Sequence, residues 1–286
     1  MNNMIALEDV SFTYPAAAGP ILDSLSLVVQ PGECFGLLGP SGAGKSTVQK
    51  ILLGLLRGYR GSASVFGRPP GRGGPRYYER VGVSFELPAS YLRLTAEENL
   101  KIFAAMYSTK TMEPLEALRL VGLDDVASQR VGTFSKGMKM RLNLARSILH
   151  EPELLFFDEP TSGQDPARAQ ITRALITSLK AQGRTIFLTT HDMAEAEQVC
   201  DRIGFLVGGR IAEEGTPAEL KRRYGKPSLL VTTEEPEGER EHQFDMHRLA
   251  DNQDFLTLLR SNRVSAMHTQ EANLNDVFVA VAGRLH

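Results

Sequence analysis

The spacing of apolar residues along the chain predicts alternating strands and helices. Runs that are apolar almost throughout, within 33–38, 154–159 and 185–190, are typical of strands buried on both faces of a parallel sheet. Apolar positions repeated at i, i+3, i+4 and i+7 over 48–55, and a similar stripe over 138–149, predict helices between these strands. Because strands and helices alternate, the sequence predicts an α/β fold with a mostly parallel sheet.

The first 223 residues are predicted to form one domain that contains two further parts. Residues 4–14 and 22–30 alternate between apolar and polar positions, so we expect them to pair as antiparallel strands. A helical subdomain is predicted at about 87–149. A capping box at 95–98 marks the start of its first helix.

Residues 224–286 are predicted to form a small α+β accessory domain. Its predicted elements are strands near 228–233 and 264–268 and helices near 247–260 and 273–283. The acidic stretch 234–241 is predicted to be a solvated loop. No motif in this domain indicates a particular chemistry.

A glycine-rich segment lies between the first buried strand and the first helix. It fits the pattern G-x-x-x-x-G-K-[ST] with Gly39, Pro40, Ser41, Gly42, Ala43, Gly44, Lys45, Ser46 and Thr47. In this context the backbone N–H groups converge on a phosphate chain, and the helix N-terminus adds positive potential. Lys45 can reach the β- and γ-phosphates, and the Ser46 hydroxyl can ligate Mg²⁺. We therefore predict nucleoside triphosphate binding rather than a chance glycine-rich turn.

Two acids end the second buried run, and a histidine follows the third. Ligands bind at the carboxyl ends of strands in open α/β sheets, which is where Asp158 and Glu159 stand. Asp158 suits Mg²⁺ binding, and the adjacent Glu159 suits a different role. His191 directly follows the strand at 185–190. A lone histidine or a strand-end acid pair is usually a surface feature, but the glycine-rich segment favours the functional interpretation here.

Composition narrows the class of protein. Of the 286 residues, 42% are hydrophobic, which is enough for a substantial core, and the formal net charge of −2 argues against a nucleic-acid binder. The two cysteines, Cys34 and Cys200, indicate no disulfide framework and favour a reducing compartment. We expect neither a membrane span nor a signal peptide. The Gly/Arg-rich stretch 67–76 is predicted to be a solvated connector, in preference to an RNA contact.

Taken together, these motifs resemble those of one known protein family. Phe134-Ser135-Lys136-Gly137-Met138 stands where the ATP-binding (nucleotide-binding domain) subunits of ABC transporters have their signature, and Asp158-Glu159-Pro160 matches their Walker B end. With the P-loop and His191, the chain resembles such a subunit over about residues 4–223. The form of the signature, and the tail at 273–278, resemble those of bacterial ABC-2 type drug and antibiotic exporters.

The resemblance implies a fold and an activity. The expected fold is a P-loop NTPase ABC cassette with a mostly parallel core, an antiparallel β subdomain and a helical subdomain. The expected activity is hydrolysis of ATP to ADP and phosphate, which would energise efflux through a separate multi-span permease. The family acts as a head-to-tail dimer with two ATP molecules between the subunits, so we expect a homodimer. The resemblance also implies that the protein is cytoplasmic and peripheral on the inner face of the cell membrane, with no nucleic-acid partner.

The resemblance also implies roles for residues. Tyr14 would stack on adenine, although its local sequence alone favours an ordinary strand-end tyrosine. Asp158 would position Mg²⁺, Glu159 would polarise the attacking water and His191 would contact the γ-phosphate. In this reading Lys45, Glu159 and His191 form the catalytic set.

Two further positions complete the implied site. Ser135 and Gly137 would serve the nucleotide of the opposite subunit. Glu86 stands where the family has a glutamine, so we count it with Ser46 and Asp158 as a candidate metal ligand. How the replacement of glutamine by Glu86 affects the coupling between the subdomains stays open.

Two other functions compete with export. A soluble ABC-type ATPase acting on the ribosome or DNA usually carries two cassettes or a long coiled coil, and neither is expected here. A non-catalytic regulatory module would not need Lys45, Asp158 and Glu159 together.

Overall fold

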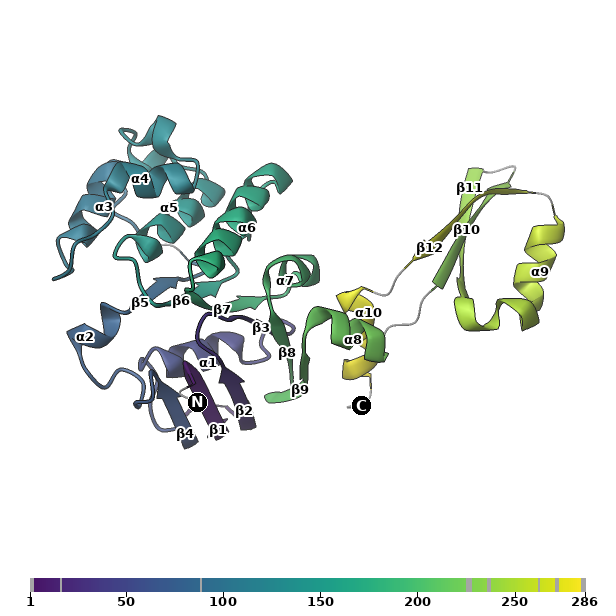
Figure 1. The fold of residues 1–286 in the computed structure, drawn as a ribbon, viewed down its shortest axis with the longest axis horizontal. Helices are drawn as coiled ribbons and strands as arrows, with labels where there is room; N and C mark the ends of the chain where they lie inside the picture. The colour runs from purple at the N-terminus through teal and green to yellow at the C-terminus, as the bar shows by residue number, and fades with distance from the viewer. Residues whose placement is uncertain are drawn as a thin grey trace. The chain divides into compact units, whose positions relative to one another are not determined.

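The computed structural model describes residues 3–15, 17–87, 89–224, 228–235, 238–261, 263–270 and 273–283. It divides into two compact units, Met1–Thr216 and Pro217–His286 (Figure 1). The division falls one helix earlier than the boundary expected at 223/224, because helix α8 (Pro217–Tyr224) packs against α10 (Leu274–Ala282). Residues 225–227, where the composition of the sequence changes at the expected domain boundary, lie outside the described residues. Within the described part of the chain, no helix is both long and apolar enough to cross a membrane.

The first unit is built on a six-stranded sheet with the order β5-β6-β7-β3-β8-β9. Its strands are β3 (Cys34–Leu38), β5 (Val81–Ser84), β6 (Leu154–Asp158), β7 (Thr185–Thr190), β8 (Arg202–Val207) and β9 (Arg210–Gly215). All neighbours pair in parallel except β8 and β9. Every residue of β3, β6 and β7 is buried, which explains why these strands are apolar without alternation. The prediction of a mostly parallel α/β sheet is confirmed.

Helix α1 (Lys45–Leu52) follows β3 in the chain. Helix α6 (Pro166–Ala181) connects β6 to β7, and α7 (Met193–Val199) connects β7 to β8. α6 begins at Asp165, whose side chain accepts a hydrogen bond from the Arg168 N–H, and Pro166 occupies its first turn. Such caps satisfy backbone donors that have no partner within the helix.

A smaller antiparallel sheet, with the order β2-β1-β4, packs beside α1. Its strands are β1 (Ile5–Phe12), β2 (Leu22–Val29) and β4 (Arg60–Val65). The buried side chains of β1 and β2 join Phe35, Phe156 and Phe187 of the central sheet in one core cluster. The predicted antiparallel pair at the N-terminus is present. A short helix, α2 (Pro75–Tyr78), follows β4.

The helical part lies between β5 and β6 in the sequence. It contains α3 (Ala96–Ala104), α4 (Pro114–Leu120), the 3-10 turns η1 (Asp124–Val126) and η2 (Val131–Thr133), and α5 (Lys136–Ile148). Figure 1 shows α3, α4 and α5 grouped together beyond the β5 edge of the sheet. The capping box between Thr95 and Glu98 is formed in both directions. α5 packs directly on β5, so the helical part is anchored at the sheet edge.

The second unit contains an antiparallel sheet with the order β11-β10-β12. Its elements are β10 (Ser228–Glu235), β11 (Gly238–Asp245), η3 (Met246–Asp251), α9 (Gln253–Arg260) and β12 (Val264–Gln270). A small core of Leu229, Val231, Phe244 and Phe255 holds α9 to the sheet.

The prediction of a solvated loop at 234–241 is wrong for the described residues. Glu234 and Glu235 continue β10, and residues 238–241 begin β11, which pairs with it in continuous register. β11 is an edge strand, and most of its side chains face solvent. An edge strand of this kind can carry charged residues on both faces, so it leaves no apolar alternation to detect.

Candidate nucleotide-binding site

The loop between β3 and α1 needs its glycines for steric reasons. Gly44 immediately precedes α1 with a φ of 109°, and a Cβ there would lie 2.8 Å from the Leu22 Cδ2 atom. A Cβ on Gly39 would lie 2.5 Å from the Leu206 carbonyl oxygen. A Cβ at either position would force its neighbour to move, so the glycines let the loop backbone lie close to the neighbouring strands.

Lys45 begins α1 and is 9% exposed. Its Nζ donates hydrogen bonds to the carbonyl oxygens of Gly39, at 2.6 Å, and Pro40, at 3.2 Å. Burial lowers the pKa of Lys45 below its usual value, although nearby carboxylates, led by Glu159, act in the opposite direction. The ammonium group is therefore held inside the loop, among acceptors that a phosphate oxygen can replace.

Asp158 is the last residue of β6 and is buried. It lies opposite Thr189 of β7 in the parallel register, and the Thr189 hydroxyl donates a hydrogen bond to its Oδ1. Burial is the main cause that raises the pKa of Asp158, and the carboxylates of Glu159 and Glu86 add to it. A divalent cation would offset both effects, so the carboxylate is suited to metal binding.

Glu159 follows with its backbone in the left-handed region, at a φ of 50°. A non-glycine residue in this region costs about 1 kcal/mol or more, and such strain is commonly found at functional sites. Its Oε1 lies 2.8 Å from His191 Nδ1, and the Thr190 hydroxyl donates to its Oε2 at 3.3 Å. His191 follows β7 and is exposed, so its ring reaches Glu159 from the solvent side.

These groups face one cavity of about 350 Å³. It is lined by Tyr14, Ile21, the loop residues from Pro40 to Thr47 except Ala43, and the three acids Glu86, Asp158 and Glu159. The Tyr14 hydroxyl lies 3.2 Å from the Thr47 hydroxyl, and its ring packs edge-on against Phe12 with centroids 4.9 Å apart. An aromatic side chain, a glycine-rich anion cradle, a lysine and carboxylates thus converge from four separate parts of the chain.

Comparison with known proteins identifies this arrangement. A family model described as ABC transporter matches residues 22–162, and one described as fluoroquinolone efflux ABC transporter C-terminal domain matches residues 232–271. The fluoroquinolones export ATP-binding protein of Mycobacterium tuberculosis (strain ATCC 25618 / H37Rv) is 50% identical over 282 residues, or 98% of this chain and 94% of that protein. The chain belongs to the ABC transporter family.

Other similar proteins support the assignment to this family. The bacitracin transport ATP-binding protein of Bacillus licheniformis is 35% identical over 98% of this chain and 90% of its own length. A solved ATP-binding subunit of an ABC transporter is 33% identical, with a TM-score of 0.69 over 78% of this chain and 93% of that one. An ATP-binding cassette solved as a dimer with ADP and Pi shares the fold at 24% identity and a TM-score of 0.68.

The predicted ABC cassette fold, with its antiparallel and helical parts and C-terminal domain, is therefore confirmed. The protein is an ATP-binding subunit of an ABC exporter, and its activity is that of an ABC ATPase.

The signature residues of this ABC ATPase lie apart from the cavity. Ser135 caps α5, where its Oγ accepts a hydrogen bond from the Met138 N–H at 3.2 Å, and it is exposed. Gly137 lies in the first turn of α5, where a Cβ would come within 3.1 Å of the Gly163 carbonyl oxygen. Neither residue lines the cavity that holds Lys45. Gly39, Ala43 and His191 do not line the cavity either, but Gly39 accepts a hydrogen bond from Lys45 and His191 contacts Glu159. Ser135 and Gly137 lie at a separate helix end.

Several groups at the site were not singled out from the sequence. Thr189 and Thr190 hold the two acids, and only the pairing register of β6 with β7 reveals this. Glu195 is fully buried on α7, and neither of its carboxylate oxygens makes a hydrogen bond of ordinary geometry within the described chain. Burial raises the pKa of Glu195 to about 7, although the nearby hydroxyls of Thr190 and Thr161 act in the opposite direction.

Proposed function

We propose that this ATPase energises drug efflux through a separate multi-span membrane permease, acting from the cytoplasmic face of the membrane. The observation that carries the proposal is the 50% identity to a fluoroquinolones export ATP-binding protein over 98% of this chain. The match of residues 232–271 to a C-terminal domain named for fluoroquinolone efflux supports the same substrate class. We therefore propose a fluoroquinolone, or a drug of similar planar and charged chemistry, as the exported compound.

The cavity fits a magnesium-bound nucleotide. Ser46 offers a hydroxyl oxygen, and Asp158 and Glu86 offer carboxylate oxygens, among the residues that line the cavity. Oxygen donors of this kind suit Mg²⁺, which would neutralise charge on the phosphates. Lys45 would exchange its two backbone carbonyl partners for phosphate oxygens, and Tyr14 would stack on the adenine ring.

Glu159 is the residue best placed to polarise the attacking water. Its carboxylate lines the cavity, and contacts with His191 and Thr190 fix its direction. With these partners, Glu159 can orient a water toward the γ-phosphate. His191 can contact the γ-phosphate as negative charge develops on it. The protein thus contributes mainly positioning and electrostatics to phosphoryl transfer.

Ser135 and Gly137 would complete the site of a second subunit in a head-to-tail homodimer. The Ser135 oxygen accepts from its own helix, so its O–H remains available as a donor to a phosphate. The N-terminus of α5, which is 13 residues long, adds favourable potential for an anion. A nucleotide bound to one subunit would be the anion that this helix end receives from the other.

The test is co-expression with a candidate multi-span permease, the first choice being one encoded next to the gene for this chain, if such a gene is found. The ATPase should co-purify with it from membranes, and cells carrying both should accumulate less fluoroquinolone than cells carrying the Glu159→Gln variant. Retention of the protein in the soluble fraction, together with equal drug accumulation in the two strains, would contradict the proposal. A ribosome-associated or DNA-associated ATPase activity in that fraction would favour the competing function instead.

A further inference from the structure

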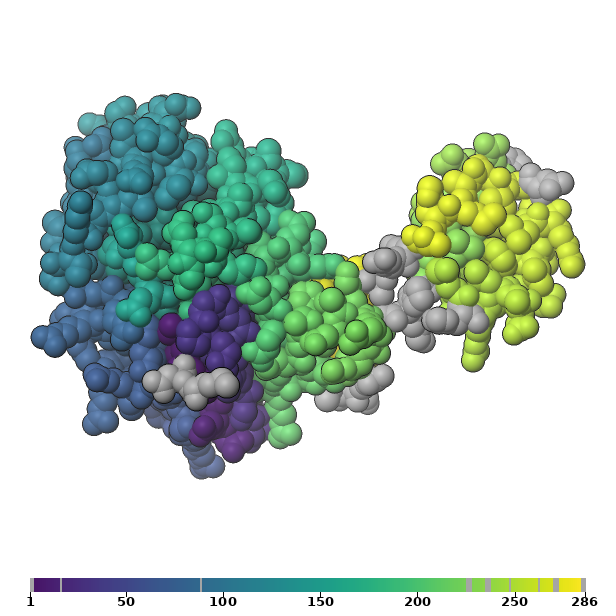
Figure 2. Space-filling view, in the orientation of Figure 1, coloured from purple at the N-terminus to yellow at the C-terminus, as the bar shows by residue number. Residues whose placement is uncertain are grey.

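A second cavity, of about 600 Å³, lies in the first unit and shares no lining residue with the nucleotide cavity. Four arginines line it, namely Arg68, Arg72, Arg76 and Arg80, and no acidic residue of the described chain lines it. The chain as a whole carries a net charge of −2, so this is a local concentration of positive charge. The segment that supplies it, coloured blue, forms part of the molecular surface (Figure 2).

We call this cavity the arginine pocket. The ring of Phe66 forms its floor. Phe66 follows β4 with a φ of 55°, a conformation that is rare for a bulky residue. Reciprocal backbone hydrogen bonds between Val65 and Arg68, of 2.8 and 3.1 Å, close the turn around it. Tyr77 packs against Phe66 with centroids 6.2 Å apart and donates a hydrogen bond to the Leu52 carbonyl oxygen. The turn therefore holds the ring in place despite the strained backbone.

One arginine is locked onto that floor. The Arg80 guanidinium carbon lies 3.7 Å from the centroid of the Phe66 ring. Its Nε and Nη2 atoms donate to the two carboxylate oxygens of Glu153 at 2.7 and 2.8 Å. A cation over a ring combined with a two-point carboxylate contact immobilises the group. Arg80 thus forms a rigid wall whose charge is partly offset by Glu153.

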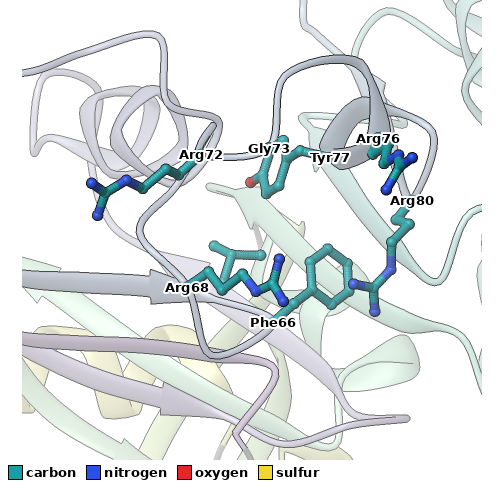
Figure 3. A pocket seen from close by; sticks show the side chains of 8 residues that line it. Phe66, Arg68, Arg72, Gly73, Arg76, Tyr77 and Arg80 are labelled. Carbon is teal, nitrogen blue, oxygen red and sulfur yellow. The ribbon is translucent and has the colours of Figure 1, made fainter.

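The other arginines make no such two-point contact, although the charge of Arg76 acts on nearby Glu79, whose carboxylate accepts hydrogen bonds from Ser108. Within the described residues, no hydrogen bond or ion pair engages the side chain of Arg68 or Arg76. Figure 3 shows Arg68 and Arg80 reaching the Phe66 ring from two sides, with Arg76 beside Arg80. Arg72 extends away from them and also lines a neighbouring hollow of about 640 Å³ together with Arg57. Repulsion among these groups is relieved by solvent or by an anion.

We propose that the arginine pocket is a binding site for a phosphoryl group. Guanidinium groups present paired N–H donors that match phosphate oxygens, and convergent arginines bind phosphate more strongly than single surface charges do. Arg68 and Arg76 supply the free donors, and Arg80 supplies a fixed wall. The phosphoryl group belongs either to an anionic lipid headgroup or to a soluble phosphate ester. The site is separate from the ATP site and does not depend on the function proposed above.

The test uses the full chain with a reporter beside the pocket. The sequence contains no tryptophan, so Tyr78→Trp introduces a single tryptophan, which can be excited selectively over the tyrosines. The ring centroid of Tyr78 lies 5.2 Å from that of Tyr77. The reporter chain also carries Lys45→Ala, which weakens phosphate binding at the nucleotide cavity, and no nucleotide is added; pyrophosphate is titrated in one arm and vesicles in the other. The vesicles contain phosphatidylcholine with or without phosphatidic acid. A response to pyrophosphate shows that the pocket takes a soluble phosphoryl group, and a response to phosphatidic acid alone identifies a lipid headgroup.

The decisive comparison is between charge-matched variants. Arg68→Ala/Arg76→Ala should weaken the affinity for the probe about a hundredfold, because each of the two lost charge-assisted contacts contributes about 1.4 kcal/mol, a factor of ten. Arg119→Ala/Arg130→Ala removes the same charge from exposed positions in the helical part and should leave the affinity unchanged. In the chain that keeps Lys45, ATPase activity should be retained in both variants. The proposal is overturned if neither probe binds, or if both double variants weaken binding equally, since the latter would show only nonspecific charge attraction.

Discussion

The nucleotide cavity and the N-terminus of α5 differ in how completely a single chain forms them. At the cavity, Lys45, Asp158 and Glu159 are buried or nearly so, and each already has a protein partner. At the start of α5, Ser135 faces solvent, and within the described residues its hydrogen bonds go to its own helix. The first arrangement is a formed pocket, and the second is an exposed helix end.

This difference indicates which step each part controls. Buried groups that already hold their partners lose little freedom when a nucleotide arrives, so the cavity is organised for binding. An exposed cap gains its anion only when another surface brings one. We therefore expect changes at the cavity to act on binding and chemistry within a subunit, and changes at Ser135 to act between subunits.

The largest expected effect comes from Glu159→Gln. The amide keeps the shape of the side chain but cannot polarise a water as the carboxylate does, so turnover should fall about a hundredfold or more. ATP binding should persist, because Lys45 and the loop backbone are unchanged. Phosphate release measures turnover, and size-exclusion chromatography with ATP should show an accumulated dimer.

Glu116→Gln is the matched control for that variant, because Glu116 is exposed on α4. It should hydrolyse ATP at the wild-type rate. Wild-type turnover by Glu159→Gln, or a strictly monomeric ATP-bound form, would remove Glu159 from its proposed role.

A mixing experiment tests the division of labour directly. Lys45→Ala disables the cavity of its own chain, and Ser135→Arg disables the helix end offered to the partner, so each variant alone should be nearly inactive. Randomly mixed dimers should recover about a quarter of wild-type activity, because half are heterodimers and each of these keeps one of two sites. The steady-state ATPase rate of the mixture is the measurement. No recovery in mixtures where heterodimers demonstrably form would contradict action across the interface.

The cavity was predictable from sequence because its parts follow local rules. The strand before Gly39 and the strand before Asp158 are apolar throughout, so their ends mark the carboxyl edge of a parallel sheet. Caps at Ser135 and Asp165 are similarly local, and the structure forms both. These features need only neighbours in the chain.

Features that depend on distant pairing were missed. The hydroxyls that hold the acids follow from the register of β6 against β7, and β11 carries too many charged residues to be recognised as a strand. The arginine pocket is a similar case. Its segment contains Gly67, Gly71 and Gly73 at positive φ, and only the folded path shows that its arginines converge.

A smaller effect is expected at Glu86, which lines the cavity from the loop after β5. Glu86→Ala removes an oxygen donor from the wall shared by Ser46 and Asp158, so the Mg²⁺ concentration needed for half-maximal ATPase should rise about tenfold. Glu86→Gln keeps an oxygen donor and should retain most of the turnover. ATPase rates measured against Mg²⁺ decide this. An Ala variant with wild-type Mg²⁺ dependence would show that Glu86 contacts neither the metal nor its waters.

The smallest expected effect is on the pH dependence of the stability of the folded chain, through Glu195 on α7. Glu195 has a pKa raised from 4.5 to about 7 in the folded chain, chiefly by burial, with Asp192 and Glu159 adding to the shift. The folded state therefore binds more protons than the unfolded state between about pH 4.5 and 7, so stability should fall as pH rises through this window, by at most about 3 kcal/mol. Glu195→Gln stays neutral and should lose less stability from pH 5 to pH 8. Thermal unfolding at both values, with Glu116→Gln as control, measures the difference. Equal pH dependence in all three proteins would mean that the Glu195 carboxyl is ionised in the fold and stabilised by its surroundings.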